Sequence, residues 1–288
     1  MERPPEWLAR SLLLGPALLA TLFFFLGSTL ILFFFSLQPF EAGQLGSGVT
    51  LASYAHFAGD PYYWGVVGTT LKVGAVTTVV CAVVGYPIAY AMDRLRRPLL
   101  RNIAYFIVFT PLMTSVIVRS YGWSLILGDS GVVNVTLAAL GLVTRPVAIL
   151  YEFTGVEIAL VHILLPFMVF PVIGVLGQVD RALREAAADL GADRWQVFRR
   201  VTLPLTLQGL IVGCELTFAL SISAFATPSL LGGGRVQVLA SLIYSDVGGL
   251  NWPLASVESF VLLAMALLSI VAFNWVLRQP LLRRATAG

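Results

Sequence analysis

The residue patterns that support nucleotide or hydrolytic chemistry are missing from this sequence. A phosphate-binding loop of the form GxxxxGK[ST] needs a lysine directly after a glycine, so that its ammonium group reaches the phosphates. The only lysine, Lys72, follows a leucine in GTTLKVG, and no GxSxG, HExxH or CxxC pattern occurs. We therefore expect no catalytic residues in this chain.

The cysteines and histidines also lack the spacing of a functional site. Cys81 and Cys214 lie far apart inside apolar runs, which favours two inert buried thiols over a disulfide. The two histidines, His56 and His162, are too few for a metal cluster, and His162 stands inside an apolar run where packing is the simpler interpretation. We expect no metal site.

Composition places the chain among membrane proteins. Of its 288 residues, 58% are hydrophobic and only 11% are charged, and the mean hydropathy is +0.88. Several apolar runs are long enough to cross the roughly 30 Å hydrocarbon core as a helix. The first run, 12–37, is too long for the core of a signal peptide. The sequence therefore predicts an all-α polytopic membrane protein whose first helix is retained.

The apolar runs predict six transmembrane helices, at roughly 12–37, 66–92, 102–127, 156–177, 205–226 and 257–277. Segments rich in helix breakers separate them, such as EAGQLGSG, RLRRP and LLGGG. Pro166 and Pro171 fall inside the fourth run, so we expect that helix to be kinked.

Basic residues predict the orientation. With the N-terminus on one side, most of the 18 basic residues fall on that same side, whereas the opposite side holds Arg145 and Arg235. Because arginine-rich loops stay in the cytoplasm, both termini are expected there. The formal charge of +3 is spread over these loops. That distribution fits lipid headgroups and gives no indication of nucleic-acid binding.

A charged segment, EAAADLGADRWQVFRRVTLP at 185–204, interrupts this apolar chain on the cytoplasmic side. Its alanine-rich start favours a helix, and Gly191 is a typical residue at a helix end. A second helix is expected to begin near Asp193, with Arg199 and Arg200 at its end. Pro204 predicts a bend into the fifth span. The segment is therefore predicted to be two short helices around a glycine elbow.

Two interpretations fit the faces of these helices. Leu183, Ala187 and Leu190 share one face of the first helix, and Trp195 and Phe198 share a face of the second. An amphipathic loop resting on the bilayer would account for those apolar faces. It does not account for the run of small alanines before a glycine, which suits close docking into a groove of another protein.

The spacing of this segment resembles the EAA loop of binding-protein-dependent ABC importer permeases. The family pattern is EAA, three residues, glycine, nine residues, an aliphatic residue, one residue and Leu-Pro. The matching residues, together with Leu190 beside the glycine, are Glu185, Ala186, Ala187, Gly191, Val201, Leu203 and Pro204. The resemblance implies a permease fold in which this loop is the helix that couples to a cytoplasmic ATPase.

Three further segments resemble the spermidine/putrescine-type branch of these permeases: VRSYGWSLILGDSGVVN at 118–134, ILLPFMVFPV at 163–172 and ATPSLLGGG at 226–234. The branch also serves opines, other amines and related solutes, so the resemblance does not identify the substrate. Some polyamine-type relatives carry an acid just before the aromatic residue that precedes TPxLLGG, where this chain has Ser223-Ala224-Phe225. That departure favours a less cationic solute.

The resemblance implies several partners. Two copies of an ATPase subunit would hold ATP and Mg²⁺, and this chain would bind no cofactor itself. A second permease chain, usually a different homologue in this branch, would complete the pathway in the bacterial inner membrane. An extracytoplasmic solute-binding protein would dock on the outer loops, for which the expected residues are Arg119, Gly232, Gly233 and Gly234. The chain would divide into a first helix with its outer loop (1–65) and a core domain (66–288), with the coupling loop at about 178–204.

Charged residues inside the spans are candidates for function because they are costly in a bilayer. Glu215, deep in the fifth span, either lines the solute pathway with Phe218, Ser221 and Phe225 or bonds to a neighbouring helix or a partner subunit. Arg119 is part of a recurring family motif, and snorkelling to headgroups explains it nearly as well. The remaining three are expected at the membrane interface rather than buried: Lys72, Glu157 and Glu258.

Two other functions make different predictions. A secondary transporter would contain paired broken helices in two related halves, and no second copy of the 185–204 pattern occurs. A membrane scaffold with an amphipathic surface loop would not require Gly191 or Glu185 for transport or ATPase binding. The importer permease is the function that the sequence favours.

Overall fold

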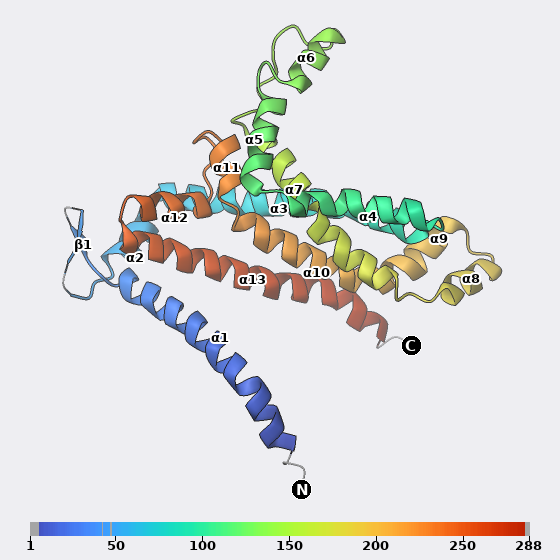
Figure 1. Cartoon of the computed structure of the whole chain (residues 1–288), viewed down its shortest axis with the longest axis horizontal. Coiled ribbons are helices and arrows are strands. Elements are labelled where there is room, and N and C mark those ends of the chain that lie inside the picture. Colours follow the sequence, from blue (N-terminus) through green and yellow to red (C-terminus); the bar gives the residue numbers. More distant parts are fainter. Residues whose placement is uncertain (1–5, 42, 47, 286–288) are drawn as a thin grey trace. The chain divides into compact units, whose positions relative to one another are not determined.

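The computed structural model describes residues 6–41, 43–46 and 48–285, which are almost entirely helical (Figure 1). Within these residues, five helices are long and apolar enough to cross a membrane, and a sixth span results if one bent pair of helices counts as a single span. The prediction of an all-α membrane protein with about six transmembrane helices is confirmed.

The elements in chain order are α1 (Glu6–Ser36), β1 (Phe40–Glu41), β2 (Gln44–Leu45), α2 (Ala52–Gly59), α3 (Pro61–Arg94), α4 (Pro98–Met113), α5 (Val116–Leu127), α6 (Val132–Ala139), α7 (Phe153–Leu176), α8 (Arg181–Asp189), α9 (Arg194–Val197), the π-helical turn η1 (Phe198–Thr202), α10 (Leu203–Ile222), α11 (Ala226–Leu231), α12 (Leu239–Gly248) and α13 (Trp252–Ala285). The two short strands form an antiparallel hairpin in which Phe40 pairs with Leu45.

The chain forms two compact units. The first consists of residues up to 63 together with 243–260, and the second consists of 64–242 together with 261 onward. In the first unit, α1 exposes large apolar side chains such as Phe23 and Phe24 along its length, as a lipid-facing helix does. Its last turn packs on the start of α13, where Phe33 meets Phe260 with ring centroids 6.1 Å apart.

The core of the second unit is the close contact between α7 and α10. Gly209 and Gly213 of α10 have the GxxxG spacing that lets helices approach closely in membranes. A Cβ at Gly209 would lie 2.6 Å from the carbonyl oxygen of Pro171, and one at Gly213 would lie 2.8 Å from Sδ of Met168. The two helices therefore meet backbone to backbone, with Met168 fully buried at the contact.

The third predicted span, 102–127, is wrong as a single helix. The chain instead forms α4 and then α5–α6, which meet at a bend of 101°. Thr114 and Ser115 at the break have extended backbone, and Pro111 removes one backbone donor from the last turn of α4. The apolar run continues through the break, so hydropathy alone does not reveal it.

The prolines predicted to distort two spans interrupt neither helix. The α7 segment is a single helix from Phe153 to Leu176 that contains both Pro166 and Pro171. Across Pro204, α9, η1 and α10 form one continuous helical stretch from Arg194 to Ile222. The π-helical turn η1 directly precedes Pro204 and loosens the regular hydrogen-bond ladder where proline lacks a donor.

Candidate functional site

The first half of the charged segment is the helix and glycine elbow that the sequence predicts. Asp180 caps α8 by accepting a hydrogen bond from the backbone N–H of Ala182 at 2.9 Å. At the other end, Gly191 adopts a φ of +86°. Its N–H donates to Ala188 at 2.9 Å and the N–H of Ala192 donates to Ala187 at 3.1 Å. This pair of bonds is a Schellman motif, which requires the left-handed conformation that glycine adopts most readily.

The second half restarts at Asp193, also as predicted. The Asp193 carboxylate accepts from the N–H of Gln196 at 2.8 Å, while the Gln196 side chain accepts from the N–H of Asp193 at 3.2 Å. This reciprocal capping box holds the start of α9 only two residues after the elbow. The elbow is therefore fixed by backbone hydrogen bonds on the α8 side and by side-chain capping bonds on the α9 side.

The elbow presents an unusually exposed apolar surface. Leu190 is 90% exposed, and Trp195, at the beginning of the Arg194–Ile222 span, is 66% exposed. Glu185, Ala186 and Gly191 are also exposed, and Ala187 is half-buried. Large apolar side chains at such exposure mark a surface that another protein or a membrane covers. The remaining predicted coupling residues are half-buried in η1 and at the start of α10: Val201, Leu203 and Pro204.

Aromatic contacts attach the second half of the segment to α3. Phe198 stacks on Trp195 with ring centroids 5.4 Å apart, which confirms that the two share a face. The same ring meets the edges of Tyr86 and Tyr90, at 5.9 and 5.2 Å. The Arg94 guanidinium lies 4.4 Å from the centre of the Tyr90 ring. The exposed elbow is therefore followed directly by residues that pack against α3.

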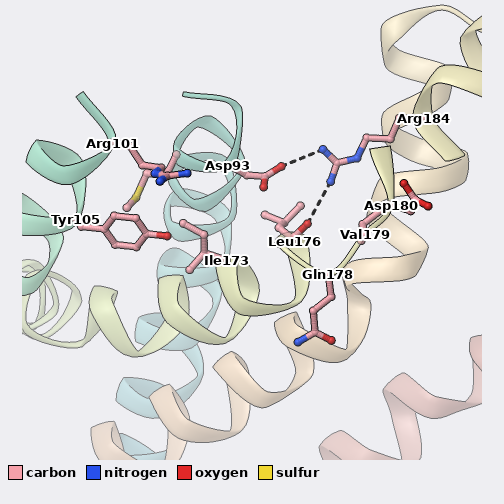
Figure 2. Close-up of a pocket in the computed structure, with 11 residues that line it drawn as sticks. Asp93, Arg101, Tyr105, Ile173, Leu176, Gln178, Val179, Asp180 and Arg184 are labelled. Atoms are coloured by element: carbon pink, nitrogen blue, oxygen red, sulfur yellow. Dashed lines mark hydrogen bonds and ion pairs between the residues drawn. The ribbon is translucent and has the colours of Figure 1, made fainter. Parts of the chain in front are cut away.

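An ion pair that sequence reasoning missed attaches the first half. Arg184 of α8 donates from Nη1 to the Asp93 carboxylate at 2.9 Å (Figure 2). Asp93 lies at the end of α3, where it is the one acid in MDRLRRP, and this isolated acid among arginines was the available signal. The pair joins two predicted loops that are distant in the sequence.

A cavity of about 750 Å³ opens where α5, α7, α10 and α11 meet. Most of its wall is apolar, with Leu160, Ile163 and Phe167 contributed by α7. Arg119 also lines it, and its Nε and Nη1 atoms are buried and make no hydrogen bond within the described residues. Of the four predicted pathway residues, Phe225 alone lines this cavity.

The structure places the other three predicted pathway residues elsewhere on α10. Glu215 accepts a hydrogen bond from the amide of Asn274 on α13 at 2.5 Å, which is the contact with a neighbouring helix that was one of the two alternatives. Phe218 is buried against Phe273 with ring centroids 5.8 Å apart. Ser221 is fully buried. The four residues are therefore not brought together on one surface.

The three glycines after α11 form a tight turn rather than a long flexible loop. Gly233 and Gly234 have φ values of +53° and +77°. A Cβ at Gly233 would overlap the Tyr151 ring, and one at Gly232 would lie 2.5 Å from the carbonyl oxygen of Pro228. The exposed pair Arg235–Glu152, 2.9 Å apart, closes the same region. Gly232 and Gly233 are needed here for close packing, and Gly234 for its left-handed backbone.

The expectation that Glu157 and Glu258 lie at the interface rather than buried is wrong. Glu157 is 7% exposed and accepts a hydrogen bond from the Thr77 hydroxyl at 2.8 Å. Glu258 is fully buried and lies within hydrogen-bond reach of Asp246. Both carboxylates face other helices. The expectation used only the position of each acid near the end of its own helix, and that position does not show which helix packs against it. Lys72 is exposed and sits 4.4 Å from the centre of the Phe153 ring.

Asp246 and Glu258 are two acids of the first unit whose side chains lie close together. Oδ2 of Asp246 and both Oε atoms of Glu258 are buried, with no donor among the described residues. Two carboxyl groups can share a hydrogen bond only if one of them is protonated. Burial raises the pKa of Asp246, and the hydrogen bond to Glu258 partly opposes that rise. The pair is thus a structural contact of two carboxyl groups within the first unit.

Comparison with known proteins identifies the family. Residues 82–279 match the family described as "Binding-protein-dependent transport system inner membrane component". The spermidine/putrescine transport system permease protein PotB of Haemophilus influenzae is 37% identical over 228 residues, covering 78% of this chain and 79% of the relative. The chain belongs to this family. It is therefore a multi-pass membrane permease, a transport subunit rather than an enzyme.

Other relatives and solved structures agree with this assignment. PotB of Escherichia coli K12 is 32% identical over 252 residues, covering 87% of this permease and 91% of the relative. A bacterial ABC transporter involved in the import of the acidic polysaccharide alginate has the same fold, with a TM-score of 0.76 over 95% of this permease and 96% of that chain. Its sequence identity is only 20%, so the likeness concerns the fold.

Proposed function

We propose that this permease forms half of the translocation pathway of an ATP-driven importer for a small solute. The observation that carries the proposal is the exposed elbow at 185–191, which backbone bonds hold on the α8 side and the Asp193 capping box holds on the α9 side. It leaves Leu190 90% exposed. In a chain of this family, an exposed leucine on a hydrogen-bonded turn is suited to binding in a cleft of another protein. Movement of that partner would pass through the elbow into α10, which continues directly from α9 and η1.

The partner at the elbow would be an ATPase subunit, in two copies, that holds ATP and Mg²⁺. We expect Glu185, Ala186, Ala187, Leu190 and Gly191 to make the contact. The other expected coupling residues would join the contact to the fifth span: Val201, Leu203 and Pro204. Their half-buried positions in η1 and at the start of α10 support this division of roles.

Two further partners complete the proposed importer. A second permease chain, most simply a different homologue, would supply the other half of the pathway. An extracytoplasmic binding protein would deliver the solute, and one solved alginate ABC transporter is in complex with a periplasmic protein bound to an alginate pentasaccharide. Gly232, Gly233 and Gly234, which form a tight turn beside Tyr151, remain the proposed docking site. Arg119, the fourth residue expected there, lines the cavity as well.

The proposed solute is a polyamine, an opine or a related small amine. The relatives named for spermidine and putrescine transport support an amine. The cavity that Arg119 and Phe225 line is the best-formed candidate for the pathway. Glu215, Phe218 and Ser221 would contribute only if α10 and α13 separate during transport. Ser223 and Ala224 supply no acid beside Phe225, which weighs against a strongly cationic solute.

The proposed arrangement in the membrane follows from the arginines. Both termini and the 178–204 segment would face the cytoplasm of a bacterial cell, and the chain would cross the inner membrane six times. Residues 1–65 would form the first helix with its outer loop, and 66–288 would form the core. The exposed apolar side chains of α1 support its contact with lipid.

The test is reconstitution in proteoliposomes with the ATPase, second permease and binding protein that purify with this chain from its native membrane. We expect uptake of a radiolabelled amine that requires both ATP and the binding protein. Spermidine, putrescine and an opine would be compared. If the chain purifies alone and moves solute on an ion gradient without ATP, the importer function is wrong.

A further inference from the structure

The ends of α3 and α7 and the start of α8 surround a cavity of about 520 Å³. Figure 2 shows Arg184 reaching across it from α8. Its Nη1 donates to Oδ2 of Asp93 at 2.9 Å, and its Nη2 contacts the carbonyl oxygen of Leu176 at 3.5 Å. Asp93 belongs to the last turn of α3 and Leu176 is the last residue of α7. One guanidinium therefore contacts the ends of two transmembrane helices.

The chemistry of this contact suits arginine. The last carbonyls of a helix have no partner within the helix, and the C-terminal end carries a partial negative charge. Arg184 directs one donor to the terminal carbonyl of Leu176 on α7 and the other to the side-chain carboxylate of Asp93 in the last turn of α3. Its planar fork can hold Asp93 and Leu176 at once, whereas a lysine would present a single point charge. The interaction is directional as well as electrostatic.

Burial distinguishes this pair from an ordinary surface ion pair. The side chains of Arg184 and Asp93 are 15% and 18% exposed. The other described pair, Arg235–Glu152, has the same 2.9 Å separation with side chains 71% and 44% exposed. Water and salt screen an exposed pair far more than a shielded one. The second pair is thus a natural control for the first.

Helix α8 otherwise contacts mainly the continuation of its own segment, α9 and η1. Most of its side chains are exposed, including Leu183, and Leu190 directly after the helix is exposed as well. The covalent route from the elbow leads through α9 and η1 into α10. It does not by itself connect α8 to α3 or α7, so another contact must do so if those helices are to move with the elbow.

We infer that Asp93 and Arg184 are positioning residues that tie α8 to the ends of α3 and α7, so that displacement of the elbow reaches both helices. The inference rests on the proposed function, because it assumes that an ATPase moves the elbow. The ion pair would be a second route, besides the chain connection into α10, by which movement of the elbow reaches the transmembrane helices. Its consequence is that breaking the pair lowers the amount of solute moved per ATP hydrolysed.

The experiment compares Asp93→Asn, Arg184→Lys and the charge-exchanged double variant Asp93→Arg with Arg184→Asp. Each is reconstituted as the full importer, and the ratio of spermidine or other identified solute taken up to ATP hydrolysed is measured. We expect Asp93→Asn to lower this ratio roughly 2- to 30-fold, the range over which residues modulate coupling between sites. Arg184→Lys should have a smaller effect, and the double variant should recover part of the loss.

Glu152→Gln, which breaks the exposed pair, is the matched control. Because that pair lies beside the proposed docking turn, a loss of docking would lower uptake and hydrolysis together, so the ratio should stay unchanged. A purely structural role would reduce complex yield, uptake and hydrolysis together and keep the ratio constant, and that result would overturn the inference. If Asp93→Asn fails to assemble, the ratio for Arg184→Lys decides the matter. If the wild-type importer shows no ATP-dependent uptake, the proposed function itself fails. If the wild type and all assembled variants take up the same amount of solute per ATP, the importer function stands and the role inferred for Asp93 and Arg184 is wrong.

Discussion

Gly191 illustrates how a single backbone conformation shapes the candidate site. Its φ of +86° lets the chain turn directly after α8, and an added Cβ would meet no atom within 4 Å. Space is therefore not the constraint at this position. The constraint is the left-handed backbone, which a β-branched residue adopts only with strain. A substitution here tests the elbow without disturbing the packing beneath it.

We predict that Gly191→Val uncouples ATP hydrolysis from uptake while the chain still inserts and assembles. Leaving the left-handed conformation relieves a strain of about 1–2 kcal/mol, so the Schellman bonds to Ala187 and Ala188 should open. The measurement is uptake and hydrolysis by the reconstituted importer. Gly141→Val is the control, because Gly141 has a similar φ of +68° with open space around it, outside the elbow. Normal coupling in Gly191→Val would exclude the elbow as the coupling device.

At the scale of elements, the contact between α7 and α10 supports the second unit. Gly209 and Gly213 let α10 lie against Pro171 and Met168 with no side chain between the backbones. Tyr86 adds a hydrogen bond from α3 to Thr206 of α10 at 2.7 Å. Because van der Waals packing drives helix association in membranes, this contact is sensitive to small increases in volume.

We predict that Gly213→Ala destabilises the permease by about 1–3 kcal/mol, the usual cost of overpacking a core. The added methyl group would meet Met168 at 2.8 Å, and the backbone of that residue is only slightly farther away. Thermal unfolding of the detergent-solubilised complex measures the effect. Gly174→Ala on α7 is the control, since its added Cβ meets nothing within 4 Å. Equal melting temperatures for both variants would contradict the close α7–α10 contact.

At the scale of the whole molecule, the distribution of arginines predicts the orientation in the membrane. Arg97 lies between α3 and α4, in the loop that carries several basic residues, and Arg145 lies between α6 and α7. Both side chains are exposed. The cysteines native to the chain, Cys81 and Cys214, are buried, so they should react slowly with a polar thiol reagent.

We predict that a membrane-impermeant maleimide labels Arg145→Cys in intact spheroplasts but labels Arg97→Cys only after the membrane is opened. The positive-inside rule is the physical reason, because translocation of short arginine-rich loops is disfavoured. The parent chain without a new cysteine serves as the control for background labelling. Labelling of Arg97→Cys from outside would reverse the proposed orientation.

Local sequence determined much of the structure. Runs of apolar residues predicted the spanning helices, because each must satisfy its own backbone hydrogen bonds in lipid. Asp193 and Gly191 predicted the helix start and the elbow, because capping depends on residues only a few positions apart. The spacing from Glu185 to Pro204 indicated the family, which the comparisons then showed.

Only the tertiary structure decided which helices exchange polar contacts. Thr77 and Glu157 are 80 positions apart, and Asp93 and Arg184 are 91 apart. Each partner looks like an ordinary residue near a helix end when taken alone. The break at Thr114 and Ser115 lies inside an unbroken apolar run. Hydropathy and capping act between neighbours in the chain, whereas burial of a charge depends on which distant helix faces it, and a single sequence carries little trace of that pairing.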